Sequence, residues 1–206
     1  GKRALYDAYI KAFRWSTDRL DLKNGGIVSF VTNGSWLDGK ATVGFRKSIE
    51  EEFSKIYVFN LRGNARTSGE LRRKEAGNVF KEGSRTPISI TLLIKKPNHK
   101  GKATIYYHDI GDYLNRDEKL NIISDFKSLD KVPFKQLKPN EEGDWINKRN
   151  KVFDTLITLG DKSKKENETF FKPKYSNGII TARDTWSWNF NKEILINNIE
   201  KTINFY

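Results

Sequence analysis

The chain has 206 residues, with 38 lysines and arginines against 26 aspartates and glutamates, so its formal net charge is +12. It contains no cysteine, which excludes disulfides, thiolate metal sites and cysteine nucleophiles. No apolar run approaches the roughly 20 residues that span a bilayer, and no segment is typical of a signal peptide, so we predict a soluble protein without a membrane partner.

An amphipathic helix is predicted for residues 3–20, where Leu5, Tyr9 and Phe13 recur at helical spacing. The next residues, 26–32, form a short and continuously apolar run with the sequence GIVSFVT. Such a run is typical of a strand that is covered on both faces of a sheet.

A second helix and a second strand follow in the same order. Residues 45–53 predict the helix, and residues 55–61 (KIYVFNL) predict another buried strand. Helices that alternate with strands over short links predict an α/β sheet. Ligands of such sheets bind outside the carboxyl ends of parallel strands. Residues 32–36 (TNGSW) and 62–70 (RGNARTSGE) are therefore expected to meet at a site.

Two further apolar runs, residues 87–96 and 102–110, are separated by the turn-forming residues 97–101 (PNHKG). A short turn between two apolar runs is typical of paired neighbouring strands. We predict that these runs form an antiparallel hairpin.

Residues 115–126 predict a helix in which Asn115 is the N-cap and Glu118 completes a capping box. After residue 131 the sequence changes to longer polar links, so we predict a domain boundary there. The elements expected beyond it are a strand at 152–158, a charge-rich loop at 160–168 and a helix at 192–206.

A long basic loop connects the second and third predicted strands. Glycine lets the backbone approach a ligand closely, and guanidinium groups bind phosphate through two parallel hydrogen bonds. A solvated connector is the simpler interpretation of a charge run. About 24 residues without structure are, however, uncommon inside a compact domain unless they are functional or disordered. The basic residues of this loop are Arg62, Arg66, Arg72, Arg73, Lys74, Lys81 and Arg85.

Phe80 lies within this loop, between Asn78 and Lys81. It can pack into the core or present a face on which a nucleic-acid base stacks, an interaction worth about 1 to 3 kcal/mol. Most aromatic residues are buried, so residue chemistry alone favours the core. Trp15 and Trp36 present the same choice.

Other catalytic and metal sites find little support in the sequence. His108, Asp109 and Asp112 resemble metal ligands, but a turn after a strand explains this spacing more simply. The histidines have no serine in a nucleophile context, and the sequence contains neither a P-loop nor a dinucleotide fingerprint. The residues alone therefore show no recognisable cofactor site or set of catalytic acids and bases.

The positive charge favours nucleic acid as the partner, because a basic protein releases the counterions of a polyanion. A basic surface that only aids solubility explains the charge equally well. An anionic membrane surface ranks third, since the sequence shows no basic amphipathic helix.

Several segments together closely resemble the methyltransferase region of large single-chain bacterial restriction-modification enzymes, often called type ISP. In these enzymes a helicase or nuclease portion precedes an adenine-N6 DNA methyltransferase. The resemblance covers nearly the whole chain and rests on residues 6–20, 25–39, 45–96, 108–120, 143–149, 159–162 and 175–190.

This resemblance implies the second half of a Rossmann-like methyltransferase sheet with an antiparallel final hairpin, followed by a less regular α+β segment. The family uses S-adenosylmethionine and flips the target adenine out of double-stranded DNA. The sequence contains neither the Asn-Pro-Pro-aromatic motif nor the glycine-bearing cofactor loop of the family. It begins at Gly1 and contains no methionine. We therefore expect a fragment that is inactive alone and works with upstream parts of the same polypeptide.

Within that fragment, residues 1–131 are expected to complete the catalytic domain, and residues 132–206 to lead toward the target-recognition domain. In adenine methyltransferases of this type, an aromatic residue before the seventh, antiparallel strand packs against the flipped base. Phe80, in NVF before PISITLLI, matches that arrangement. Contacts to DNA phosphates are expected from Arg62, Arg66, Arg72, Arg73, Lys74, Arg85 and Arg183.

The resemblance thus predicts an S-adenosylmethionine-dependent, site-specific DNA methyltransferase in the bacterial cytoplasm. Two alternatives remain open. One is a nucleic-acid-binding module without chemistry, and the other is a scaffold whose basic face meets an acidic protein partner. An Asn-Pro-Pro-aromatic motif encoded before Gly1 would decide for the enzyme.

Overall fold

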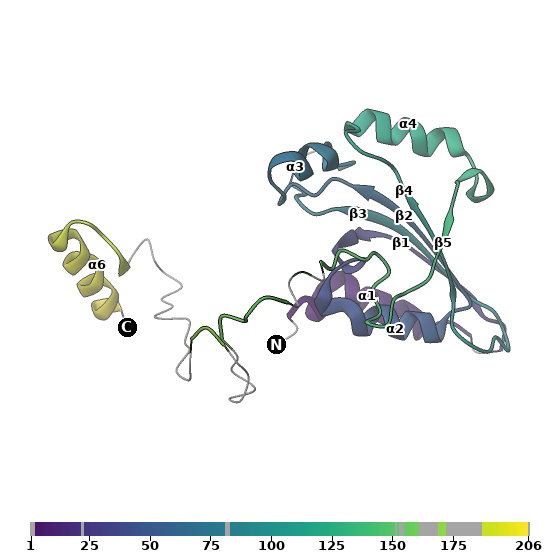
Figure 1. Cartoon of the computed structure of the whole chain (residues 1–206), viewed down its shortest axis with the longest axis horizontal. Coiled ribbons are helices and arrows are strands. Elements are labelled where there is room, and N and C mark those ends of the chain that lie inside the picture. Colours follow the sequence, from purple (N-terminus) through teal and green to yellow (C-terminus); the bar gives the residue numbers. More distant parts are fainter. Residues whose placement is uncertain are drawn as a thin grey trace. The chain divides into compact units, whose positions relative to one another are not determined.

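A computed structural model of the chain describes residues 3–21, 23–80, 83–150, 152, 155–160, 169–171 and 187–205. The chain divides into two compact units, Gly1–Arg149 and Asn150–Tyr206. The first unit contains the sheet, and the second contains the helix α6 (Lys192–Phe205) (Figure 1). None of the helices in the described part of the chain has the length and apolar character needed to cross a membrane.

The first unit is an α/β structure built on a mixed sheet with the strand order β1-β3-β2-β4-β5 (Figure 1). β3 is antiparallel to both β1 and β2, whereas β2 and β4 are parallel and β5 is antiparallel to β4. β1, β2 and β4 therefore end at the same edge of the sheet. The strands are β1 (Gly26–Asn33), β2 (Lys55–Arg62), β3 (Ile88–Lys95), β4 (Thr104–Asp109) and β5 (Lys135–Leu137).

The antiparallel hairpin predicted from residues 87–96 and 102–110 is wrong, although β3 is antiparallel as expected. β3 lies between β1 and β2, and β4 pairs with the far side of β2. Strands are spaced by about 4.8 Å, so residues 96–103 need to cross only about 10 Å to pass over β2. A nearly continuous apolar strand such as β3 is stabilised by a central place with partners on both sides.

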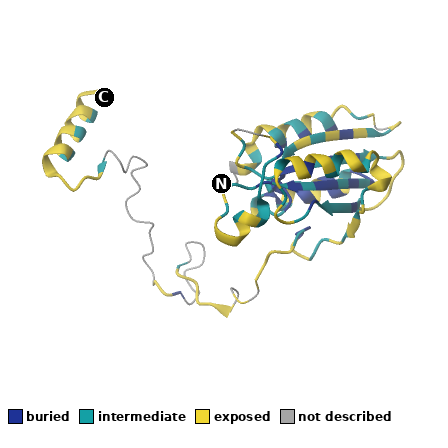
Figure 2. Ribbon diagram, turned by 90° about the horizontal axis from the view of Figure 1, so that it is seen from above, coloured by how far each residue is buried: buried dark blue, intermediate teal, exposed yellow. Residues whose placement is uncertain are grey.

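Helices cover the two faces of the sheet. α1 (Ala8–Thr17) and α2 (Val43–Glu52) lie on one face, and α4 (Arg116–Phe126) lies on the other (Figure 1). The first face packs around Phe13, Trp36 and Phe53, and the second around Phe59 and Leu61. The buried positions gather in the strands and on the inner sides of these helices (Figure 2).

The prediction that residues 26–32 are covered on both faces is wrong for β1. Val28 is buried, but Ile27 and Val31 are 61% and 54% exposed. β1 is an edge strand of the described sheet. On the face of the sheet that α4 covers, Phe126 of α4 packs against Phe59 of β2 and its neighbours, away from β1. Apolar sequence therefore identified the strand but not what covers it.

The first unit continues through Arg149, beyond the boundary predicted at residue 131. β5 extends the sheet, and Trp145 is buried in the core beneath α1 and α2. Asp144 forms an ion pair of 3.2 Å with the fully buried Arg46 of α2. The polar links in the sequence concealed these contacts because the partners lie far along the chain, 98 residues away for Arg46 and Asp144.

The remaining predicted elements have different outcomes. The capping box of α4 is confirmed, since Asn115 accepts from the backbone of Glu118 and Glu118 accepts from the backbone of Asn115. The helix predicted at 192–206 is confirmed as α6. The helix predicted at 3–20 is shorter, because a 3-10 turn (Arg3–Tyr6) precedes α1. Most of the strand predicted at 152–158 and of the loop at 160–168 lies outside the described residues.

Candidate nucleic-acid interface

The two stretches expected at the carboxyl ends of parallel strands do meet there. A polar cleft of about 420 Å³ is lined by Gly34 and Ser35 from the first stretch and by Arg62 and Asn64 from the second. Asn60, Tyr107 and Asp109 contribute further lining from β2 and β4. The topology explains this meeting, because β1, β2 and β4 end at one edge of the sheet.

Hydrogen bonds and ion pairs fix one wall of the cleft. Asn60 donates to the Tyr107 hydroxyl at 3.0 Å, and that hydroxyl donates to Asp109 at 3.0 Å. Arg62 Nε donates to Asp109 at 2.6 Å, and its Nη1 contacts Asp112. Burial, with the nearby Asp109 charge, raises the pKa of Tyr107 well above its usual range, so the phenol stays protonated.

The guanidinium of Arg62, which is partly exposed in the cleft, is therefore held by two carboxylates. We predicted Arg62 as a phosphate contact, but its charge is neutralised by Asp109 and Asp112. This pairing also accounts for the two aspartates that resemble metal ligands in the sequence. The residues that the structure describes contain no group of three His, Asp or Glu side chains suited to a metal ion.

The long basic loop is partly folded. It contains α3 (Gly69–Glu75), whose C-terminus is capped by Arg72 Nη1 donating to the Ala76 carbonyl at 2.7 Å. Asn78 closes the rest of the loop, since its Nδ2 donates to the carbonyls of Gly63 at 3.2 Å and Thr86 at 2.8 Å. One asparagine thus ties the end of β2 to the start of β3.

Phe80 stands on the surface at the end of this closed loop. Its side chain is 51% exposed, whereas its neighbour Val79 is 9% exposed. The Phe80 backbone N–H donates to Asn78 Oδ1 at 2.9 Å. The core packing favoured by residue chemistry alone is therefore wrong for Phe80, although it is right for Trp36, which is fully buried. Trp15 is exposed, and the Arg19 guanidinium lies 3.5 Å from its ring centroid.

Two of the predicted phosphate contacts on the loop that carries Phe80 are free cations among the described residues. Arg66 and Arg85 are exposed and form no side-chain hydrogen bond or ion pair with the described residues. The Ala65 N–H donates to the Arg85 carbonyl at 3.0 Å, which holds the two arginines on adjacent parts of the loop. Their charges remain available to an anionic ligand.

The other predicted basic residues differ in how their charges are used. Arg73 is exposed and forms a long ion pair of 3.5 Å with Glu70. Lys74 lies 3.7 Å from Asp112 and is partly exposed, and Arg72 serves the helix end described above. Lys81 and Arg183 lie outside the described residues.

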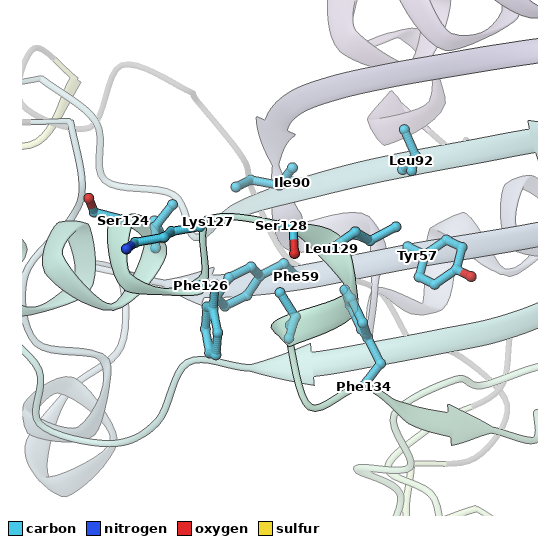
Figure 3. A pocket seen from close by; sticks show the side chains of 12 residues that line it. Tyr57, Phe59, Ile90, Leu92, Ser124, Phe126, Lys127, Ser128, Leu129 and Phe134 are labelled. Carbon is cyan, nitrogen blue, oxygen red and sulfur yellow. The ribbon is translucent and has the colours of Figure 1, made fainter.

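A separate pocket of about 440 Å³ lies on the α4 side of the sheet (Figure 3). Its lining is apolar and aromatic, with Phe59, Phe126 and Phe134 around it and Tyr57 and Leu92 on the strands. None of the predicted DNA-contacting residues lines this pocket. The candidate interface is therefore the loop that carries Phe80, Arg66 and Arg85, together with the polar cleft beside it.

Sequence reasoning missed Lys119, which is fully buried on α4. Lys119 lies at helical spacing from Ile122, Ile123 and Phe126, so it belongs to the apolar face of its helix. A lysine on the apolar face of a helix needs buried hydrogen-bond acceptors. Its place in the helical pattern was therefore the feature of the sequence that could have identified it.

Several solved structures are similar to the chain. It matches the ATP-dependent Type ISP restriction-modification enzyme LlaBIII bound to DNA with a TM-score of 0.89 and 42% identity, over 100% of this chain and 14% of that one. A nuclease-deletion mutant of the Type ISP enzyme LlaGI, in complex with a DNA substrate mimic, matches with a TM-score of 0.80 and 42% identity over 95% and 15% of the chains. A DrdV-DNA complex matches with a TM-score of 0.82 and 30% identity over 98% and 20%.

The chain thus spans only 14% to 20% of the length of these proteins. A scan against models of protein families finds no match. A search of curated proteins finds none either.

Proposed function

The chain belongs to the type ISP restriction-modification enzymes, as one region of such a polypeptide, and we propose that it forms the DNA-facing part of an adenine-N6 methyltransferase site. The observation that carries this proposal is Phe80, an exposed aromatic ring on a closed loop before the antiparallel strand β3. The methyl donor would be S-adenosylmethionine, held by parts of the polypeptide that carry the cofactor loop.

The proposed role of Phe80 is to stack against the target adenine after the base leaves the duplex. An extruded base loses its stacking neighbours, and an aromatic face restores part of that energy. Phe80 suits this role because its ring is exposed while its backbone is held by Asn78. A ring on a fixed backbone loses less conformational entropy on binding than one on a free loop.

Arg66 and Arg85 would contact the phosphates on either side of the flipped nucleotide. Both guanidinium groups are exposed and unpaired within the described residues, and both lie on the loop that carries Phe80. Phosphate contacts position a protein on DNA without reading sequence. The similar enzymes LlaBIII, LlaGI and DrdV were each determined with DNA or a DNA mimic, which supports DNA as the ligand.

The remaining basic residues differ in whether their charges are available to DNA. Arg73 and Lys74 are partly available and would add to the positive field around the loop. Arg62 and Arg72 are used inside the protein, so we do not propose them as phosphate contacts. Arg183 stays a prediction from the family resemblance.

Replacing Arg66 or Arg85 by alanine is expected to weaken binding to any duplex and to flatten its salt dependence. Each phosphate contact contributes about 0.9 to the slope of log affinity against log salt, so each change should reduce the slope by about 1. Binding by fluorescence anisotropy over a salt series measures this slope.

The matched control is Lys100→Ala. Lys100 is exposed in the turn between β3 and β4, at the opposite edge of the sheet. Its removal lowers the net charge equally but should leave the slope nearly unchanged. If Arg66→Ala and Arg85→Ala leave the slope as it is in the unaltered chain, these residues do not contact phosphate.

A further inference from the structure

The backbone that leads into Phe80 is held by the first turns of α4. Lys119 Nζ donates to the carbonyls of Glu75 at 2.9 Å and Gly77 at 2.6 Å. Arg116 Nε donates to the Val79 carbonyl at 3.1 Å, directly before Phe80. These three carbonyls lie within one short segment, residues 75–79, that ends at the exposed ring.

The local structure of α4 explains why these two side chains reach the same segment. Residues three apart in a helix lie on one face, so Arg116 and Lys119 point the same way. The capping box formed by Asn115 and Glu118 fixes where the helix begins. The positions of both donors are therefore set by the start of α4.

The segment also packs closely against that helix start. The Gly77 N–H donates to the Leu114 carbonyl at 3.2 Å. A Cβ atom at Gly77 would lie 2.6 Å from the Arg116 nitrogen and 3.1 Å from the Asn115 carbonyl carbon. No larger residue fits there without moving the backbone, so the approach of the segment to α4 is tight.

Lys119 is fully buried, and its surroundings are charged. The carboxylates of Glu75 and Asp109 favour its ammonium form, whereas Arg62 and Arg72 oppose it. Burial, the largest effect, lowers the pKa of Lys119 to about 8. A buried lysine is costly unless its donors are satisfied, and here two backbone carbonyls accept from two of the three ammonium N–H groups.

We propose that Lys119 and Arg116 are positioning residues that hold the segment 75–79 so that Phe80 presents its ring to the extruded base. This inference rests on the proposed function of Phe80, but the hydrogen bonds from Arg116 and Lys119 to the segment are a property of the protein without DNA. Lys119 touches no DNA in this arrangement and acts only through the backbone.

The test compares Lys119→Met with Lys127→Met in the 206-residue chain. Methionine keeps the length and apolar packing of the lysine stem but cannot donate to the two carbonyls. Lys127 is exposed at the C-terminal end of the same helix, so its replacement removes an equal charge without touching the segment. Arg116→Met provides a second variant, in case Lys119→Met does not fold.

Two readouts are needed. The first is the quenching of 2-aminopurine, placed opposite an abasic position in a duplex, by the bound chain. The second is amide hydrogen exchange of residues 76–80 without DNA. Lys119→Met is expected to lose most of the quenching that depends on Phe80, to bind the duplex within about threefold of the original affinity, and to exchange these amides at least tenfold faster. Lys127→Met should change neither readout.

Each outcome decides one of the two claims. If Lys119→Met and Arg116→Met keep the quenching and the slow exchange, the positioning proposal fails while the function of Phe80 stands. If the unaltered chain shows no quenching that depends on Phe80, the proposed function fails. The rate of amide hydrogen exchange of residues 76–80 then still decides whether the side chains of α4 stabilise the segment.

Discussion

Phe80→Ala is expected to lower the rate of DNA methylation by the full-length enzyme by about 5- to 150-fold, with little loss of duplex affinity. The range corresponds to about 1 to 3 kcal/mol for stacking a base on an aromatic ring, at 1.4 kcal/mol per tenfold change. Under the proposed function, the loss should appear in methylation because the ring would contact the base only after the base leaves the duplex. Affinity comes mostly from phosphate contacts and should change by less than about threefold.

Single-turnover methylation and equilibrium binding on the same duplex measure the two effects separately. Phe80→Tyr and Phe80→Trp are the matched variants, because both keep an aromatic face on the same backbone and should retain most of the rate. Phe80 is half exposed, so its truncation should disturb folding little. Equal losses of methylation and binding in Phe80→Ala would instead assign the residue a role in folding.

Arg46→Ala is expected to destabilise the first unit by about 3 to 5 kcal/mol. The Arg46 side chain is fully buried and donates to the carbonyls of Trp36 at 2.7 Å and Gly39 at 2.9 Å. It also donates to the Gly143 carbonyl and forms an ion pair with Asp144. Removing one partner of a buried pair leaves unsatisfied polar groups in the core, and this strongly lowers the free energy of unfolding.

Urea unfolding of the two chains measures this difference as a shift in midpoint. Domains of this size are stable by about 5 to 15 kcal/mol, so the loss is a large part of the total. Arg14→Ala is the control, since Arg14 forms ion pairs with Asp18 and Glu52 but its side chain is 53% exposed. It should cost about 1 kcal/mol or less. Similar losses in both variants would show that Arg46 does not anchor residues 143–144 to α2.

The sequence predicted local features better than distant pairings. The capping box of α4 depends on Asn115 and Glu118, which are three residues apart, and it formed as expected. The partner of β3 depends on residues that lie far along the chain, and a nearby turn misleadingly suggested a hairpin. Strand pairing is decided by the burial of both faces and both edges, and neighbouring sequence does not contain that information.

The candidate site shows the same limit. Charge and glycine content identified the loop, but they could not separate Arg62, which pairs with Asp109 and Asp112, from Arg66 and Arg85, which are exposed and unpaired among the described residues. Phe80 is held by Asn78, which lies within the segment, and the segment is held by α4, which lies far along the chain. Tertiary contacts therefore decide which of several similar residues remains available to a ligand.

The family resemblance supplied what residue chemistry could not. The net charge and the alternation of predicted helices and strands indicated a basic α/β protein, with nucleic acid as one of two equal interpretations of the charge. The similarity to LlaBIII at 42% identity over the whole chain places it among the type ISP enzymes. The roles that we propose for Phe80 and the arginines combine that family with the exposure and pairing of each side chain.

The role proposed for Phe80 is tested most directly by the fluorescence of 2-aminopurine opposite an abasic position, titrated with the unaltered chain and with Phe80→Ala across a salt series. Both proteins are expected to bind with similar affinity and salt dependence, and only the unaltered chain is expected to quench the base strongly. Equal quenching by both proteins would contradict this role. The loop would then be a basic surface that contacts DNA without receiving the base.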